Sequence, residues 1–222
     1  GFGGATCAQT LAKKLGAEEA EVMLIDQNNF FVFHPFLIEA GTGSLAPRHA
    51  VVGIRKFIGG ARFQMGRFLE ADPENQRIRY LPEGASEPSV MDYDHLVLGL
   101  GSVTSLPEIP GLREHAVSIK TIGDAIDLRD HAIRLLERAD LADDPAERRN
   151  LLHFVVVGGN FTGVEAAGEF EVFLQRARRH YRNVSAEDIR VTLVEITQRI
   201  LPGLAEDLSS YAVDRLRRRG ID

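Results

Sequence analysis

The sequence predicts an α/β protein of two Rossmann-like dinucleotide-binding domains with parallel sheets, both of them incomplete within these 222 residues. Three observations lead to this prediction. Predicted strands alternate with predicted helices, a pattern typical of a mostly parallel sheet covered on both faces. Two glycine-rich turns, at residues 1–4 and 158–163, each lead into a helix of small residues. Two prolines and a glycine within 105–112 predict a linker between the halves, so the expected domains are 1–112 and 113–222.

The first half is expected to contain a short series of helices and strands. They are a helix after the turn at 1–4, a strand at 21–26, a helix near 48–58, paired strands within 62–81, and a buried strand at 93–101. The paired strands are predicted because Asp72, Pro73, Glu74 and Asn75 form a turn-favouring cluster between them.

The second half continues the alternation of strands and helices. The expected elements are a helix from about 122 to 140, a polar loop at 142–150, a strand before Gly158, a helix from Gly163 to about 181, a strand at 188–196 and a helix at 205–220. Thr121 and Asp124 have the spacing of a capping box, which predicts the start of the first helix.

Composition excludes several classes of function. A net charge of −6 gives no reason to expect a nucleic-acid partner, and the arginine clusters are interpreted as solvated helix faces. Cys7 is the only cysteine, so neither an intramolecular disulfide nor a two-cysteine redox centre can form. No apolar run reaches the roughly 18 residues of a membrane span, and no leader opens the chain. The expected compartment is therefore cytoplasmic, and no metal site is predicted.

The glycine turn at the N-terminus has half of a dinucleotide-binding motif. In the pattern G-x-G-x-x-G, the glycines make the turn, let the backbone approach a diphosphate, and let the helix pack on the strand. Gly1 and Gly4 fit the second and third glycines, so the first glycine and its strand are expected before residue 1. Asp26 ends the next strand, where a carboxylate would bind ribose hydroxyls. The alternative is that GFGG is a flexible end and Asp26 a surface carboxylate.

The second turn lies in FVVVGGNFTGVEAAGE, residues 154–169. Gly158 and Gly163 fit the first and third glycines, and Glu195 ends the next strand. A carboxylate there would accept from a ribose 2′-OH and repel a 2′-phosphate, which favours NAD over NADP.

Asn160 stands where the second glycine of this motif is expected. The turn should survive, because Asn tolerates left-handed backbone better than most residues. The side chain would nevertheless crowd a diphosphate. Our hypothesis is a real but weakened dinucleotide site, and the alternative is a structural turn that binds nothing.

Motifs along nearly the whole chain resemble one family, the type II NADH:quinone oxidoreductases among the two-dinucleotide-domain flavoproteins. The matching stretches are GFGG, VMLIDQNNFFVFHPFL followed by GTGSLAP, YDHLVLGLGS, SIKTIGDA, VVVGGNFTGVEAAGE, and VTLVE followed by ILPGLAEDLSSYA. Two departures stand out: Gly99-Leu100-Gly101 replaces the usual A-T-G, and Asn160 replaces a glycine.

The resemblance implies two cofactors, FAD and NADH, and a set of residues that hold them. The FAD domain is expected at 1–112, without its first strand, and its cofactor-binding residues are Gly1, Gly3, Gly4, Asp26 and Gly101. The NADH domain is expected at 113–222, without its C-terminal part, and its cofactor-binding residues are Gly158, Gly159, Asn160, Gly163 and Glu195. It also implies that Glu165 lies near the nicotinamide and flavin rings; the alternative is a solvated residue favoured by the helix dipole. The rings of Phe30, Phe31, Phe33 and Phe36 would line the flavin side by this resemblance, but for each ring separately the favoured interpretation is core.

The implied activity of the complete protein is hydride transfer from NADH to flavin and electron transfer to a quinone. A quinone-site segment and a membrane-associating tail are expected beyond residue 222, which would bring the protein to the inner face of the membrane. Residues 1–222 alone are expected to be inactive, and self-association as a homodimer stays open. Two alternatives are an NADH reductase of a small electron-transfer protein and a non-catalytic nucleotide-binding or redox-sensing module.

Overall fold

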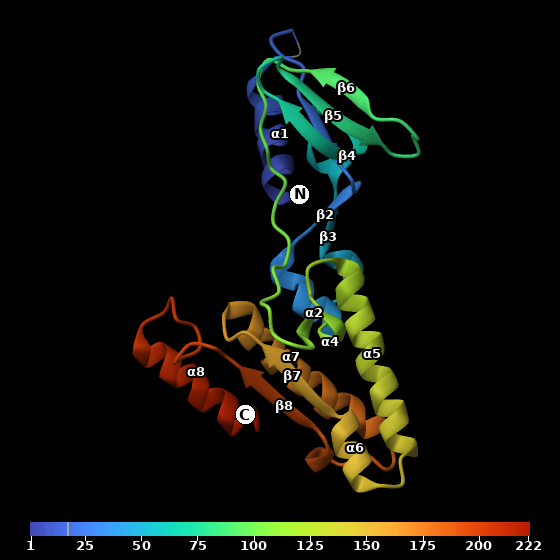
Figure 1. The fold of residues 1–222 in the computed structure, drawn as a ribbon, viewed down its shortest axis with the longest axis vertical. Coiled ribbons are helices and arrows are strands. Elements are labelled where there is room, and N and C mark those ends of the chain that lie inside the picture. The colour runs from blue at the N-terminus through green and yellow to red at the C-terminus, as the bar shows by residue number, and fades with distance from the viewer. Residues whose placement is uncertain (17) are drawn as a thin grey trace. The chain divides into compact units, whose positions relative to one another are not determined.

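The computed structural model describes residues 1–16 and 18–222, which divide into two compact units (Figure 1). The first unit comprises Gly1–His34 and Arg48–Arg113, and the second comprises Pro35–Pro47 and Glu114–Asp222. The division near residue 113 lies beside the expected linker. The segment Pro35–Pro47, which the sequence suggested for the first domain, belongs by its contacts to the second unit.

The first unit is a helix on a mixed sheet, with a separate two-stranded ribbon. Its elements are α1 (Phe2–Lys14), β1 (Met23–Asp26), β2 (Phe30–Val32), β3 (Val51–Gly53), α3 (Ile54–Phe57), β4 (Arg62–Asp72), β5 (Arg77–Pro82) and β6 (Ser89–Asp92). The short α4 (Leu112–His115) includes the boundary between the two units, between Arg113 and Glu114. The sheet has the order β1-β4-β5-β6, and only β1 and β4 run parallel. Strands β4, β5 and β6 pair antiparallel, so the sheet of this unit contains one parallel pair and two antiparallel pairs.

Small residues bring α1 close to the core of the first unit. Ala5 and Ala8 face inward and are buried with Phe31, Ile54 and Ile58. Phe31 stacks edge-on against Phe57, with 5.1 Å between ring centroids. Phe31 is therefore core, as each ring of the aromatic group was interpreted, whereas Phe36 is 43% exposed.

Two predicted elements of the first unit are wrong. Within the expected helix 48–58, only Ile54–Phe57 is α-helical, because Val51–Gly53 pairs with Phe30–Val32 instead; the 3-10 helix Pro47–His49 precedes that strand. The expected strand at 93–101 is not a strand in the structure; Tyr93 donates its N–H to the carbonyl of Gln76 at 2.9 Å, but no sheet ladder follows. Val97 and Leu100 along it are 63% and 66% exposed, so an apolar run alone did not make a strand.

The second unit has two parallel strands with helices around them. Its elements are α2 (Leu37–Thr42), α5 (Ile122–Leu141), α6 (Pro145–Leu151), β7 (His153–Val157), α7 (Phe161–Ala177), β8 (Arg190–Val194) and α8 (Glu206–Arg218). Strands β7 and β8 pair in parallel along their full length. An isolated parallel bridge joins Val191, in β8, to Ile221. This alternation of parallel strands and helices is the predicted one.

The core of the second unit is built by side chains from almost all of its elements. Leu136, Leu152, Leu174, Val191 and Ile221 are fully buried in it. Helix α2 packs on α5 and α7, and a Cβ at Gly41 would lie only 3.4 Å from the carbonyl oxygen of Ala125. This close approach explains why Pro35–Pro47 belongs to the second unit.

Helix starts in the second unit follow local capping signals. Thr121 and Asp124 form the predicted capping box at the start of α5. Helix α6 lies where a loop was predicted, although the signal was present: Asp144 accepts from Ala146 N–H, and Pro145 stands at the first helical position. Among the described residues, no helix is long and apolar enough to cross a membrane.

Candidate functional site: two glycine-rich turns

The turn after β7 needs glycine at three positions for steric reasons. Gly158 has a backbone φ of +108°, which residues with a Cβ rarely adopt. A Cβ at Gly159 would lie 2.7 Å from Cγ2 of Ile200, and one at Gly163 only 1.7 Å from the carbonyl oxygen of Gly158. The backbone of this turn is therefore fixed by its own packing.

Asn160 does not have the left-handed backbone that the sequence suggested. Its φ of −79° and ψ of −174° are extended, and any residue can adopt them. It is the N-cap of α7, and its side-chain Oδ1 accepts from the N–H of Gly163 at 3.1 Å. The first-turn N–H groups of Phe161 and Thr162 have no acceptor within the described residues. These two groups and the positive end of the helix dipole suit an anion.

Glu195 lies directly against this turn. Its Oε2 accepts from the N–H of Gly159 at 2.6 Å, and its Oε1 accepts from the N–H of Thr197 at 2.8 Å. These bonds, that of Thr197 first, lower the pKa of the Glu195 carboxyl below its usual value. Glu195 is thus a fixed negative charge at neutral pH, held where β8 ends.

Glu165 extends from the first turns of α7 and is exposed. It follows Val164, whose N–H closes the first helical turn on the carbonyl of Asn160. The side chain is accessible to a ligand. This exposure agrees with a role near the cofactor rings and equally with a solvated surface position.

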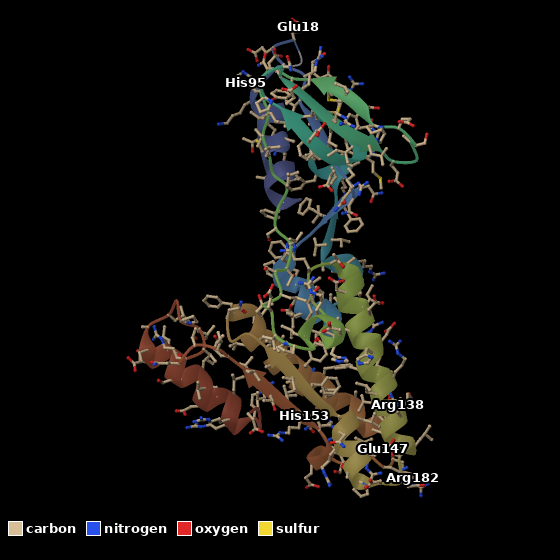
Figure 2. All side chains as sticks on the ribbon, viewed as in Figure 1. Glu18, His95, Arg138, Glu147, His153 and Arg182 are labelled. Atoms are coloured by element: carbon tan, nitrogen blue, oxygen red, sulfur yellow. The ribbon has the colours of Figure 1, made fainter. Side chains whose placement is uncertain are left out.

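The loop after β8 supports the turn in a way that sequence reasoning missed. Leu201 donates its N–H to the carbonyl of Gly159 at 2.7 Å, and Ile200 packs over the same glycine. At the far end of the strands, His153, labelled in Figure 2, lies 2.9 Å from Thr192 through Nε2 and Oγ1. No local sequence signal indicates these contacts, because they join segments some 40 residues apart.

The first turn, at the start of α1, is open toward the surface. Gly1 caps α1 without a side-chain contact, and a Cβ at Gly1 or Gly3 would meet no atom within 4 Å. A Cβ at Gly4 would contact Leu24 at 3.5 Å, so Gly4 is where the helix approaches β1. Absence of side chains at Gly1 and Gly3 leaves room for a ligand to approach the backbone.

Two further predicted residues of the first unit lie near this turn. Asp26 ends β1; one of its oxygens contacts the amino nitrogen of Gly1, and the other accepts from Asn28 N–H at 2.9 Å. A Cβ on Gly99 would lie 3.1 Å from the nitrogen of Gly4, so this segment passes close to the helix start. Gly101, two residues on, has φ +74°.

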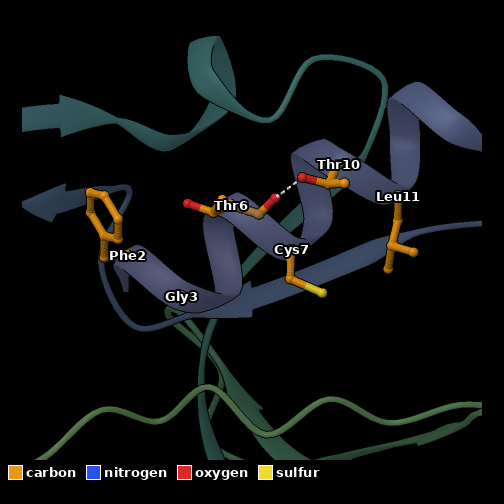
Figure 3. A pocket seen from close by; sticks show the side chains of 6 residues that line it. All are labelled: Phe2, Gly3, Thr6, Cys7, Thr10 and Leu11. Carbon is orange, nitrogen blue, oxygen red and sulfur yellow. Dashed lines mark hydrogen bonds between the residues drawn. The ribbon is translucent and has the colours of Figure 1, made fainter.

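Two hollows lie beside the first turn. One of about 420 Å³ runs along α1 and is lined by Phe2, Gly3, Thr6, Cys7, Thr10 and Leu11 (Figure 3). The Thr10 hydroxyl donates to the carbonyl of Thr6 at 2.8 Å. The other, of about 350 Å³, adjoins Asp26 and includes Gln27, Asn28 and Arg67. Both hollows combine apolar and hydrogen-bonding groups.

Comparison with known proteins identifies the family. The family model described as pyridine nucleotide-disulphide oxidoreductase matches residues 1–222. The chain belongs to this family. Residues 1–222 contain one cysteine, Cys7, and so cannot form a disulphide among themselves.

Curated relatives of this family member are named as NADH-ubiquinone oxidoreductases. The external alternative enzyme of Yarrowia lipolytica mitochondria is 34% identical over 209 residues, covering 90% of this chain and 36% of that protein. A probable NADH dehydrogenase of Dictyostelium discoideum is 30% identical, covering 95% of this chain and 48% of that protein. The chain therefore spans between a third and a half of the length of these relatives.

Solved structures share the fold. NDH2 from Plasmodium falciparum, in complex with NADH, matches with a TM-score of 0.87 at 24% identity and covers 97% of this chain and 44% of that chain. The sulfide:quinone oxidoreductase of Aquifex aeolicus matches with a TM-score of 0.71 at 17% identity, covering 98% of this chain and 47% of that one. These matches agree with the α/β fold predicted from the sequence.

Proposed function

We propose that the complete protein is a flavin-dependent NADH dehydrogenase that passes electrons to a quinone. The observation that supports it best is the turn at 158–163, where helix α7 begins with two unpaired N–H groups beside the ionised Glu195. The names of the curated relatives agree with this proposal. Each of the two turns would hold the diphosphate of one dinucleotide.

The residues of the first unit fit FAD. Gly1 and Gly3 leave the start of α1 open, Gly4 allows the helix to approach β1, and Asp26 offers a carboxylate to ribose hydroxyls. Gly101 has a φ of +74°, which favours glycine, and without a side chain its backbone could come close to the flavin. When bound, the flavin would supply the capacity to accept a hydride and release electrons.

The residues of the second unit fit NADH. Gly158, Gly159 and Gly163 shape the turn, Asn160 caps the helix, and Glu195 would accept from the ribose 2′-OH. The fixed charge of Glu195 would repel a 2′-phosphate, which favours NADH over NADPH. Glu165, exposed one turn into α7, is proposed to lie beside the nicotinamide and flavin rings and to orient them.

An anaerobic titration of the full-length protein with NADH tests the redox proposal. Stoichiometric bleaching of the flavin absorbance band is expected, followed by recovery of the band when a quinone analogue is added. Recovery with a ferredoxin- or rubredoxin-type carrier, and not with quinone, would instead identify a reductase of an electron-transfer protein.

The same titration addresses a non-catalytic binding or sensing module, which one observation favours. Asn160 occupies a helix N–H that a dinucleotide would otherwise use. NADH binding without bleaching would support this reading and reject the dehydrogenase.

Membrane contact and location complete the proposal. The Yarrowia lipolytica relative is a mitochondrial enzyme by name, and a quinone acceptor is membrane-soluble. The complete protein is therefore proposed to work at a membrane surface reached from the cytoplasm or an equivalent compartment. Sedimentation of the full-length protein with lipid vesicles checks this part, and size-exclusion chromatography checks whether it forms a homodimer. A protein that stays in the supernatant would remove the membrane from the proposal.

Replacing Glu165 with Ala tests its role. We expect turnover with NADH and quinone to fall at least about tenfold while the melting temperature stays unchanged, because an exposed side chain adds little to stability. Glu147→Ala, at an exposed glutamate of α6, which precedes the start of β7 whereas the turn follows the end of that strand, is the matched control and should keep its rate. A wild-type rate in Glu165→Ala would remove Glu165 from the site.

A further inference from the structure

We propose that Asn160 sets the affinity of the second turn for dinucleotides, because its carboxamide competes with the diphosphate for the N–H of Gly163. This inference rests on the proposed function, since it assumes that a dinucleotide binds at this turn. It assigns Asn160 a specific and reversible effect on binding, through one hydrogen bond.

The structure separates what the turn needs for folding from what it presents to a ligand. Glycine is required at 158 by a positive φ, and at 159 and 163 by contacts that a Cβ could not make. At position 160 the backbone is extended and places no such demand. A glycine at position 160 would matter only because it lets a diphosphate approach the backbone. Asn160 is therefore expected to affect ligand binding and not folding.

Asn160 puts its own oxygen where a ligand oxygen would be expected. The N–H of Gly163 is the third of the helix, the group that a capping side chain or a bound anion satisfies. Here Oδ1 of Asn160 accepts from it at 3.1 Å. A diphosphate must therefore either displace the carboxamide or bind without this donor.

The remaining donors of the turn make this competition consequential. Glu195 accepts from the N–H of Gly159 at 2.6 Å, so that group is engaged as well. Within the described residues, Phe161 and Thr162 keep free N–H groups in the first turn of α7. Freeing Gly163 would add a third donor to these two.

Three substitutions at position 160 in the full-length holoprotein test the inference. Asn160→Gly frees Gly163 and should lower the dissociation constant for NADH and for ADP-ribose about tenfold, the size expected for one charge-assisted hydrogen bond. Asn160→Ala frees the same N–H and should change both constants in the same direction. Asn160→Asp keeps the cap and nearly the same shape but adds a negative charge, so it should weaken both ligands about tenfold or more.

Calorimetric titration with ADP-ribose gives a readout separate from hydride transfer, because this ligand has the diphosphate but no nicotinamide. Adenosine, which lacks the diphosphate, is the control ligand, and its affinity should not change in any variant. Melting temperatures of Asn160→Gly and Asn160→Asp should stay close to that of the wild type, because glycine and aspartate are both accepted at an N-cap.

Outcomes distinguish this inference from the proposed function. If NADH bleaches the flavin of the wild type while Asn160→Gly binds ADP-ribose no tighter, the competition is refuted and the dehydrogenase stands. If neither the wild type nor any variant binds NADH or ADP-ribose, the proposed function and this inference both fail. Looser binding in Asn160→Gly would show that the carboxamide assists the ligand, which also overturns the competition.

Discussion

At the scale of single residues, the turn after β7 contains glycines with separate physical roles. Gly158 supplies a backbone angle, whereas Gly159 and Gly163 supply space for Ile200 and for the carbonyl of Gly158. Asn160 has neither role, and its side chain caps the helix. A motif that reads as one pattern is therefore several independent constraints, and each can be changed by itself.

Gly163→Ala should destabilise the protein by about 3 kcal/mol or more, because its Cβ would lie 1.7 Å from a backbone oxygen that cannot turn away. Urea denaturation measures the loss. Gly123→Ala in α5 is the matched control: the nearest atom is 3.6 Å away, and alanine should stabilise the helix by about 0.5–1 kcal/mol. Equal stability of the two variants would contradict this description of the turn.

The pKa of Glu195 is lowered by backbone N–H groups, of Thr197 first and then of Gly159, which favour the charged carboxylate. A depressed folded-state pKa stabilises the fold above the ordinary value of 4.5, and this contribution is lost as pH falls below that value. Glu195→Gln should therefore be less stable than the wild type at pH 7. The difference in urea midpoint should shrink between pH 4.5 and lower pH, and a constant difference would speak against the assigned cause.

At the scale of elements, helices were predicted well where a local signal marks their start. The capping box of Thr121 and Asp124 is local in sequence, and α5 begins there as expected. Asp144 and Pro145 form an equally local signal, and α6 was missed because its polar residues read as a loop. The strand pairs β4 and β5 followed from the turn cluster at Asp72.

Thr121→Ala tests the capping box. It removes the acceptor of Asp124 N–H, a bond of 3.1 Å, and should cost about 1 kcal/mol. Thr121→Ser keeps a hydroxyl at the same place and should lose only a few tenths of that amount. The free energy of unfolding from urea titrations checks both, and a loss that is equal in the two variants would show that packing, and not the cap, is responsible.

Errors in the prediction of elements came from pairing partners that the sequence cannot reveal. The segment around Val51 is helical in pattern but extended in fact, because it forms a ribbon with the strand around Phe31. Residues 96–101 are apolar but belong to no strand. In the candidate site, glycine spacing and strand-end carboxylates could be read from the sequence. The links of Glu195 to Gly159 and of Asn160 to Gly163 could not, because they depend on side-chain geometry in the folded turn.

At the scale of the whole molecule, the chain passes between its two units three times. It enters the second unit for Pro35–Pro47, returns to the first at Arg48, and enters the second again at Glu114. Helix α2 within the first passage is largely buried, with Leu37 and Ile38 each 3% exposed. The two units are separate in packing but interleaved in sequence.

A single proteolytic cut within residues 102–109, which lack regular secondary structure, should not release a separate second unit. The N-terminal fragment keeps α2, whose apolar side chains are buried among α5 and α7. Both fragments of the nicked full-length protein should therefore elute together in size-exclusion chromatography and separate only in denaturant. Elution as two species under native conditions would show that α2 contributes little to the second unit.

Because residues 35–47 pack in the second unit, they also limit how this protein can be redesigned. A chimera built only from the residues after 113 would contain α5 and α7 but lack α2, which packs on both. Apolar side chains would then be exposed to solvent, which promotes aggregation. A designer who wants a portable nucleotide-binding module from this protein must transplant the early segment as well, through a new covalent joint to the later one.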